Sequence, residues 1–165
     1  MTETRILGVD PGTQISGYAL IHISHNRQLK LITSGIIKTN PKDPIHKRYH
    51  TIFTSISAII HEYQPNTLSI ETQFVQKNPA SAMKIAMARA AVLIAGVEQN
   101  LEVFEYTPTT VKKAIAAKGQ ASKEQIMHMI KVLLNLKEPI KSDDQADAIA
   151  LALCHGFRQK RNVYV

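Results

Sequence analysis

The chain has 165 residues, of which 44% are hydrophobic and 20% are charged, and its formal net charge is +7. This size is typical of one compact domain, so we expect a single domain over residues 1–165. A lone cysteine, Cys154, excludes internal disulfides and is typical of a reducing compartment, so we expect a cytoplasmic protein. We expect no leader sequence and no membrane span, because the continuous apolar runs are shorter than the roughly 18 residues that a span needs. The positive charge favours a polyanionic partner such as nucleic acid.

The first three predicted elements are strands. Residues 5–10 (RILGVD) show no alternation of apolar and polar side chains, which is typical of a strand buried on both faces. Residues 16–23 and 29–39 follow as strands joined by a polar turn, which predicts an antiparallel meander. A helix is expected at residues 44–63, where isoleucine and tyrosine recur at helical spacing.

The remaining elements alternate between strands and helices. We expect a strand at 67–71, a helix at 80–99, a strand at 102–106, a helix at 107–117, and two further helices that begin near Ser122 and Ser142. Each of these serines has a glutamine three residues later, as in a capping box. The order β-β-β-α-β-α-β-α-α-α predicts an α/β fold, a five-stranded mixed sheet with helices on both faces.

Two predicted strands end on a carboxylate. Asp10 follows the apolar run ILGV, and Glu71 follows the short run LSI. In the last predicted helix, Asp144 and Asp147 are three residues apart and share one face, whereas Asp143 lies about 100° of rotation away from Asp144. Distant parts of the chain therefore carry acids at the ends of largely apolar elements.

Each of these acids also has a purely structural explanation. Asp10 precedes a Pro-Gly pair, a pattern typical of a type II turn in which Gly12 has a positive φ. A glutamate at the end of a strand, such as Glu71, is commonly solvated. Asp143 and Asp144 lie in the first turn of a helix, where the helix dipole stabilises a negative charge, and we interpret Asp143 in this way.

Together, the acids favour a metal site. Carboxylates that lie close together raise one another's pKa unless a cation neutralises them. Oxygen ligands suit Mg²⁺ or Mn²⁺, and two such ions about 3.5–4 Å apart activate a water molecule and stabilise the leaving oxygen in phosphodiester cleavage. A basic protein with an acidic pocket suits this chemistry. The residue types alone thus favour a metal-dependent nuclease, with the structural explanations as the alternative.

Five motifs carry a family resemblance: ILGVDPGTQISGYALI, SIETQFVQKNPASAMKIAMARA, VFEYTPTTVKKAI, ASKEQIMHMI and DQADAIALALCH. In this order they resemble the RuvC-type Holliday junction resolvases over nearly the whole chain. The resemblance implies a ribonuclease H-like fold, a homodimer, and symmetric, Mg²⁺-dependent nicking of four-way DNA junctions that leaves 5′-phosphate ends. It also implies a role in homologous recombination and DNA repair, with a branch-migration helicase as a partner.

The resemblance assigns roles to individual residues. It places the catalytic and metal-binding acids at Asp10, Glu71, Asp144 and Asp147, and it leaves Asp143 out. It implies two Mg²⁺ ions per site, for which Mn²⁺ can substitute.

Three further residues match DNA-binding positions of the family. Phe74 matches an aromatic residue that stacks on unpaired bases at the junction centre, a contact worth about 1–3 kcal/mol. Lys112 and Lys123 match basic residues near the scissile phosphate. Without the resemblance, Phe74 would be interpreted as a core residue and both lysines as solvated positions.

The chain also departs from the family pattern. Ala90 stands where many members have glycine, and Ala117 and Lys118 stand where a glycine-containing turn is more usual. The alanine- and methionine-rich helix that contains Ala90 is the expected dimer face.

Three other functions remain open at this point. The DPGT motif also resembles the first phosphate loop of actin-like sugar kinases, but that architecture needs two such domains. A DNA-binding module without catalysis would not need four intact acids. A ribonuclease H-like enzyme that acts on RNA or on RNA–DNA hybrids fits the acids as well, and only Phe74 favours branched DNA.

Overall fold

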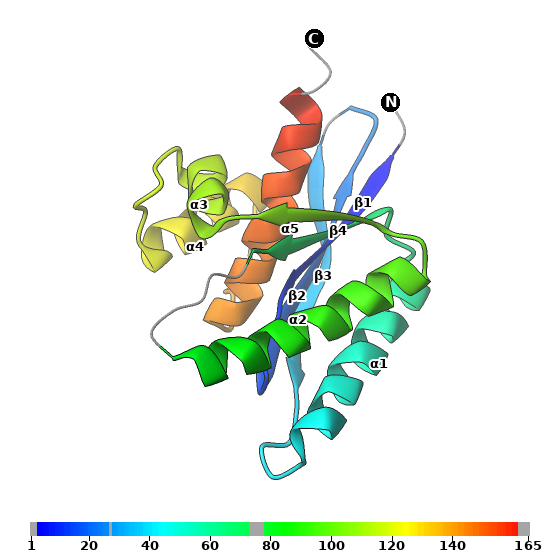
Figure 1. Cartoon of the computed structure of the whole chain (residues 1–165). Helices are drawn as coiled ribbons and strands as arrows, with labels where there is room; N and C mark the ends of the chain where they lie inside the picture. The colour runs from blue at the N-terminus through cyan, green and yellow to red at the C-terminus, as the bar shows by residue number, and fades with distance from the viewer. Residues whose placement is uncertain (1–2, 27, 73–77, 162–165) are drawn as a thin grey trace.

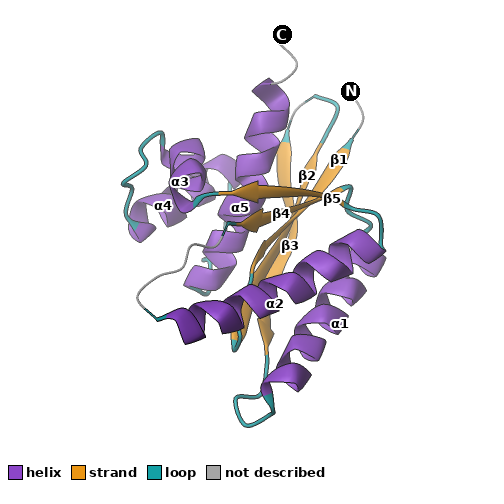
Figure 2. Ribbon diagram, viewed as in Figure 1, coloured by secondary structure: helices purple, strands orange, loops and turns teal. Residues whose placement is uncertain are grey.

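The computed structural model of the chain describes residues 3–26, 28–72 and 78–161. Ten elements occur in this part of the chain, each close to its predicted position (Figures 1 and 2). The strands are β1 (Thr4–Asp10), β2 (Ile15–Ile23), β3 (Leu29–Lys38), β4 (Thr67–Glu71) and β5 (Glu102–Tyr106). The helices are α1 (Ile45–Tyr63), α2 (Pro79–Glu98), α3 (Pro108–Ala116), α4 (Lys123–Leu134) and α5 (Asp143–Arg161).

The strands form one mixed sheet in the order β3-β2-β1-β4-β5. The pairs β1–β2 and β2–β3 are antiparallel, as the predicted meander requires, whereas β1–β4 and β4–β5 are parallel. In the parallel pair β1–β4, Val9 lies opposite Ile70. The next residues, Asp10 and Glu71, therefore end neighbouring strands at the same edge of the sheet.

Helices cover both faces of the sheet (Figure 1). Along β1 the side chains alternate: Ile6 packs into a core with α3, α4 and α5, while Leu7 and Val9 pack into a second core with α1 and α2. All three side chains are fully buried. The prediction that β1 is buried on both faces is confirmed.

Two glycines allow α5 to lie directly on the sheet. A Cβ added at Gly8 in β1 would collide with the carbonyl oxygen of Ala148, and one at Gly17 in β2 would collide with that of Asp144. Backbone can approach backbone this closely only where no side chain intervenes. The N-terminal turn of α5 is consequently fixed against the end of β1.

The starts of α4 and α5 differ from each other. The capping box predicted at α4 is confirmed. At α5, Ser142 Oγ accepts a hydrogen bond from the backbone N–H of Gln145 (3.2 Å), but Gln145 Oε1 accepts from the N–H of Lys141 (2.9 Å). Gln145 Nε2 also donates to Ser34 Oγ in β3 (2.8 Å). The full capping box predicted at Ser142 is therefore wrong, because the Gln145 side-chain oxygen accepts from Lys141 and not from Ser142, while the amide nitrogen joins the helix to the sheet.

Candidate active site

The four predicted acids lie at one edge of the sheet. Asp10 ends β1 and Glu71 ends β4, while Asp144 and Asp147 lie in the first turns of α5. Gly17 is the strand partner of Asp10 and contacts the backbone of Asp144, so the start of α5 lies against the end of β1. All four acids are half-buried. Segments that are far apart in the sequence thus bring the predicted set together.

The acids influence one another electrostatically. Burial, followed by the nearby charges of Asp147, Glu71 and Asp144, raises the pKa of Asp10 to about 7, against a weaker opposing effect of Lys123. Burial and the charge of Asp147 also raise the pKa of Glu71. The site therefore holds more negative charge than it can keep ionised without a counter-charge.

A third member of the set shows the same effect. Burial raises the pKa of Asp147, and the charges of Asp143 and Asp144 add to it, while Lys123 and Lys112 lower it. Oxygen donors that are short of counter-charge fit a hard divalent cation. Within residues 3–26, 28–72 and 78–161, no three Asp, Glu, His or Cys side chains are already arranged as a complete ligand set. Metal ligation by these acids therefore stays a prediction.

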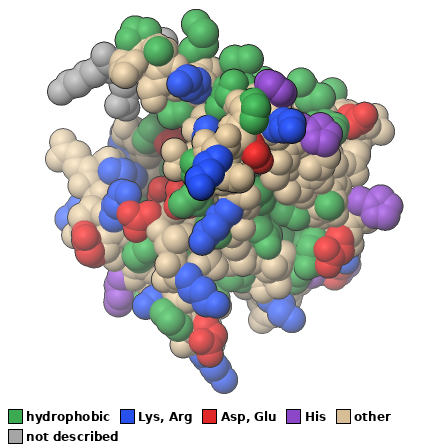
Figure 3. Space-filling model, turned by 90° about the horizontal axis from the view of Figure 1, so that it is seen from below, with side chains coloured by type: hydrophobic (Ala, Val, Ile, Leu, Met, Phe, Trp, Pro, Cys, Tyr) green, Lys and Arg blue, Asp and Glu red, His purple; other side chains and the backbone are tan. Residues whose placement is uncertain are grey.

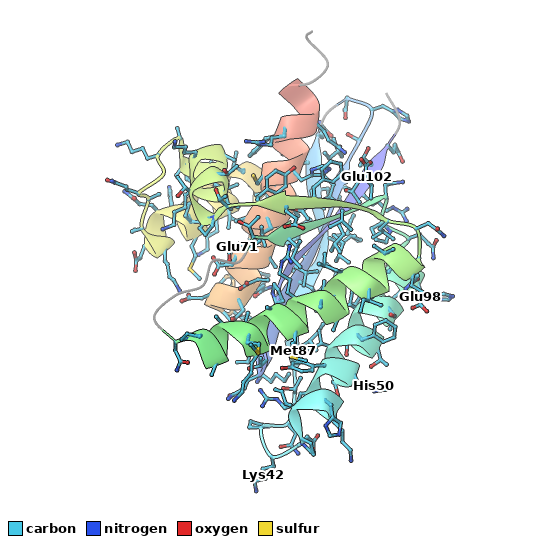
Figure 4. The ribbon with its side chains drawn as sticks, in the orientation of Figure 1. Lys42, His50, Glu71, Met87, Glu98 and Glu102 are labelled. Carbon is cyan, nitrogen blue, oxygen red and sulfur yellow. The ribbon has the colours of Figure 1, made fainter. Side chains whose placement is uncertain are left out.

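Both predicted lysines border the same pocket. The pocket has a volume of about 170 Å³ and lies between α3, α4 and α5, with Glu71, Asp147, Lys112 and Lys123 among its lining residues. Figure 4 shows Glu71 between α5 and the α3–α4 pair. Lys123 Nζ also forms an ion pair with Asp143 Oδ2 at 2.7 Å. Asp143, which was left out of the metal set, thus has a cationic partner of its own.

The turn after Asp10 differs from its prediction. Gly12 does not adopt a positive φ. A side chain there would instead collide with the carbonyl oxygen of Ile15, so glycine is needed for space. Ser16 Oγ closes the turn, because it accepts from the N–H of Gly12 (3.1 Å) and donates to its carbonyl (2.9 Å).

Two arginines that the sequence analysis missed hold the backbone near the acids. Arg48 Nε donates to the carbonyl of Thr13 at 2.9 Å, three residues after Asp10. Arg89 Nε donates to the carbonyl of Glu71 itself at 3.1 Å. For Arg89 a signal was present, because a cation in the middle of an apolar helix needs a partner. Phe74, the predicted base-stacking residue, lies outside the described residues.

With this geometry in place, residues 6–155 match the family described as crossover junction endodeoxyribonuclease RuvC. The chain belongs to the RuvC family. A relative of that name from Chlamydia pneumoniae is 45% identical over 152 residues, which cover 91% of this chain and 90% of the relative. Another, from Natranaerobius thermophilus, is 40% identical over 150 residues, which cover 91% of this chain and 92% of the relative. The family predicted from the motifs is confirmed.

Solved structures agree with this assignment. The chain is similar to Thermus thermophilus RuvC in complex with a Holliday junction substrate, with a TM-score of 0.90 and 31% identity over 96% of both chains. It also shares its fold with the yeast mitochondrial Holliday junction resolvase, at a TM-score of 0.65 and 14% identity over 97% of this chain and 84% of the other. The predicted ribonuclease H-like fold with a five-stranded mixed sheet is confirmed.

Proposed function

We propose that the protein is a structure-specific endonuclease that resolves four-way (Holliday) DNA junctions by paired, symmetric cuts. The observation that carries the proposal is the gathering of the four carboxylates at one sheet edge, where burial and the charges of the other three raise the pKa of Asp10 to about 7. The chain aligns with RuvC relatives over about nine-tenths of its length. The similar structure from Thermus thermophilus is described as bound to a Holliday junction, which supports branched DNA as the substrate.

Mg²⁺ is the proposed cofactor, with two ions per site, and Mn²⁺ is expected to substitute. The residues that would hold the ions are Asp10, Glu71, Asp144 and Asp147. When bound, the ions would supply an activated water molecule and stabilise the leaving oxygen. Because the pKa of Asp10 is raised to about 7, cation binding below that pH would displace a proton from this site. The cut is proposed to leave 5′-phosphate ends.

Cations beside the acids are proposed to bind the DNA backbone. Lys112 and Lys123 line the pocket that also contains Glu71 and Asp147. On the face seen in Figure 3, Lys and Arg side chains form a band across the molecule. Such a band attracts phosphates without regard to base sequence. Phe74 is proposed to stack on an unpaired base at the junction centre.

A second copy of the chain is the proposed partner of α2. Its exposed apolar residues recur at alternating spacings of four and three, which is the pattern of a helix-pairing seam. These residues are Met83, Met87, Ala90, Ile94 and Val97. We call them the α2 seam. The four larger side chains are between 51% and 66% exposed. Two equivalent cuts need two active sites, and a dimer supplies them.

The opposite side of α2 belongs to the core. By length and composition α2 is apolar enough to cross a membrane, but Ala88, Val92 and Ala95 are fully buried against the rest of the protein. A helix that packs on one side and exposes an apolar seam on the other favours pairing with a second protein surface.

The cellular role is proposed from the family resemblance. We expect the protein to act in the cytoplasm in homologous recombination and DNA repair, together with a branch-migration helicase. Cys154, which is fully buried, has its pKa raised to about 11 by burial and so stays a thiol.

A cleavage assay on synthetic four-way junctions tests the proposal. The protein is incubated with Mg²⁺ and either a junction or a linear duplex of matched sequence, and the ends of the products are mapped. Paired symmetric cuts with 5′-phosphate ends are expected in the junction only. Asp10→Asn is expected to bind the junction without cutting it. Equal cutting of duplex and junction, or cutting of neither, would contradict the proposed function, and preferential cutting of an RNA–DNA hybrid would favour the ribonuclease alternative.

A further inference from the structure

Arg89 connects α2 to the end of β4. Its side chain is only 17% exposed, although it projects from a helix that is otherwise mostly apolar. Its Nε donates to the backbone carbonyl of Glu71 at 3.1 Å, and its Nη2 pairs with Glu105 Oε2 in β5 at 2.5 Å. One guanidinium therefore joins three elements: a helix and two neighbouring strands.

The Glu71 carbonyl that Arg89 contacts lies at the end of β4, where the pairing of this strand with its neighbours stops. Pairing between β1 and β4 ends at Val9 and Ile70, one residue before Glu71. Pairing between β4 and β5 ends at Glu71 and Tyr106. Its last hydrogen bond runs from the N–H of Thr72 to the carbonyl of Tyr106 at 2.9 Å. Glu71 is thus the last residue of its strand, and Arg89 supplies a donor at this point.

We propose that Arg89 is a positioning residue that holds the main chain of Glu71, so that the Glu71 carboxylate keeps its place among the acids of the site. A planar guanidinium serves two acceptors at once in a fixed geometry, which an ammonium group does not. Glu105 orients the guanidinium and compensates its charge. This inference rests on the proposed nuclease function of the site.

The same contact ties the active site to the α2 seam. Arg89 is followed directly by Ala90, the central residue of the seam, and Figure 4 shows Met87, another seam residue, on the same helix. A second protein surface that packs on the seam would therefore hold the helix segment that anchors Glu71. Dimer contact and the placement of a catalytic acid depend on one stretch of α2.

Four variants test the positioning role. Arg89→Met removes the contacts to both Glu71 and Glu105. Arg89→Lys keeps the positive charge but replaces the planar guanidinium with a single ammonium group. Glu105→Gln removes the ion pair and leaves the hydrogen bond from Arg89 to the Glu71 carbonyl. Arg5→Met is the matched control, because Arg5 Nη1 also donates to a backbone carbonyl, that of Tyr63 at 2.8 Å, but at the opposite end of β1.

The readouts are the single-turnover cleavage rate at saturating protein, junction affinity in EDTA, and the oligomeric mass. For Arg89→Met we expect a cleavage rate about 100-fold below wild type with junction affinity and mass unchanged, because small displacements of catalytic groups have effects of this size. The cleavage rate should fall less in Arg89→Lys and in Glu105→Gln than in Arg89→Met, and Arg5→Met should cut at the wild-type rate. Wild-type cleavage by Arg89→Met, or a loss of junction affinity that matches the loss of cleavage, would overturn the inference.

A second measurement separates this inference from the proposed function. If wild type itself does not cut junctions, the proposed function fails, and the Mg²⁺-induced rise in melting temperature then tests Arg89 alone. That rise should be smaller in Arg89→Met than in wild type and unchanged in Arg5→Met. An equal rise in Arg89→Met and wild type would refute the positioning role.

Discussion

The backbone carbonyl oxygen of Asp144 occupies the position that a side chain at Gly17 would need. Gly17 is also the strand partner of Asp10, so this contact sets how closely the first turn of α5 approaches the end of β1. Gly17→Ala is expected to push α5 away from the sheet. We expect the free energy of unfolding to fall by about 1–3 kcal/mol, and junction cleavage to fall more than junction affinity. Urea unfolding and cleavage assays measure the two effects.

Gly35→Ala is the control for this substitution. Gly35 lies in β3, and an added Cβ there would come within 3.0 Å of the Tyr18 hydroxyl group, the outer end of a partly buried side chain and not a backbone atom. This variant should therefore lose little stability and no cleavage. Equal losses in the two variants would show that crowding of the sheet, and not the placement of α5, causes the effect.

In the absence of divalent ions, Asp10 is expected to destabilise the folded protein at neutral and alkaline pH. Its pKa of about 7 lies above the ordinary value of 3.8, so between these values the folded protein keeps a proton that the unfolded chain has lost. Stability contributed by this group therefore falls as the pH rises from about 4 to about 7. Asp10→Asn does not ionise, so in EDTA at about pH 8 it should melt several degrees above wild type.

Mg²⁺ should reverse the order of the two melting temperatures, so that wild type melts above Asp10→Asn. Binding of the ion to the folded state raises the melting temperature of wild type, whereas Asp10→Asn has lost a ligand and should respond weakly. Asp43→Asn, which removes an exposed carboxylate just before α1, should respond like wild type. A wild-type protein whose melting temperature is insensitive to Mg²⁺ would remove the basis for the metal site.

Ala117→Gly is expected to stabilise the protein. Ala117 follows the last residue of α3 with φ 58°, in the left-handed region that disfavours a side chain. Relief of this strain should add about 1 kcal/mol to the free energy of unfolding, which thermal or urea unfolding detects. Ala114→Gly, inside the same helix, should instead cost about 1 kcal/mol. A loss of stability in both variants would show that Ala117 is not strained.

Ile94→Glu should separate the two copies of the proposed dimer. The substitution places a charge in the middle of the α2 seam, where pairing would strip it of water. Sedimentation should show a monomer, and coordinated cutting of both strands should be lost. Val132→Glu changes a valine of similar exposure on α4, outside the seam, and should leave the mass unchanged. A monomeric wild type, or a dimeric Ile94→Glu, would contradict the proposed interface.

Element positions were predictable from the sequence because each element has a local pattern. The unalternating run before Asp10 predicted a strand buried on both faces, and Ile6 and Val9 are indeed buried in different cores. Asp10, Glu71, Asp144 and Asp147 were also predictable as a group, because each ends or begins an apolar element. Their shared location follows from the parallel pairing of β1 with β4 and from the approach of α5 to the sheet.

The backbone partners of the arginines were not predictable. The position of Arg89 in an apolar helix indicates that it needs a partner, but no sequence pattern identifies the main-chain carbonyls to which Arg48 and Arg89 donate. The reason for glycine at position 12 was missed for a similar reason, since the need for space arises from the path of Ile15 and not from a turn type. The side chain of Gln145 reaches β3 across the fold, which no local capping pattern predicts.

The last of the described helices, α5, supplies two of the four acids and also a continuous buried segment, from Ala148 to Cys154, at the centre of one core. During synthesis, α5 leaves the ribosome after every other described element. Until then, Asp10 and Glu71 have no partners from α5, and the sheet face that α5 covers is open to water. A nascent chain that lacks α5 therefore has neither the buried segment that fills this core nor the complete set of four acids.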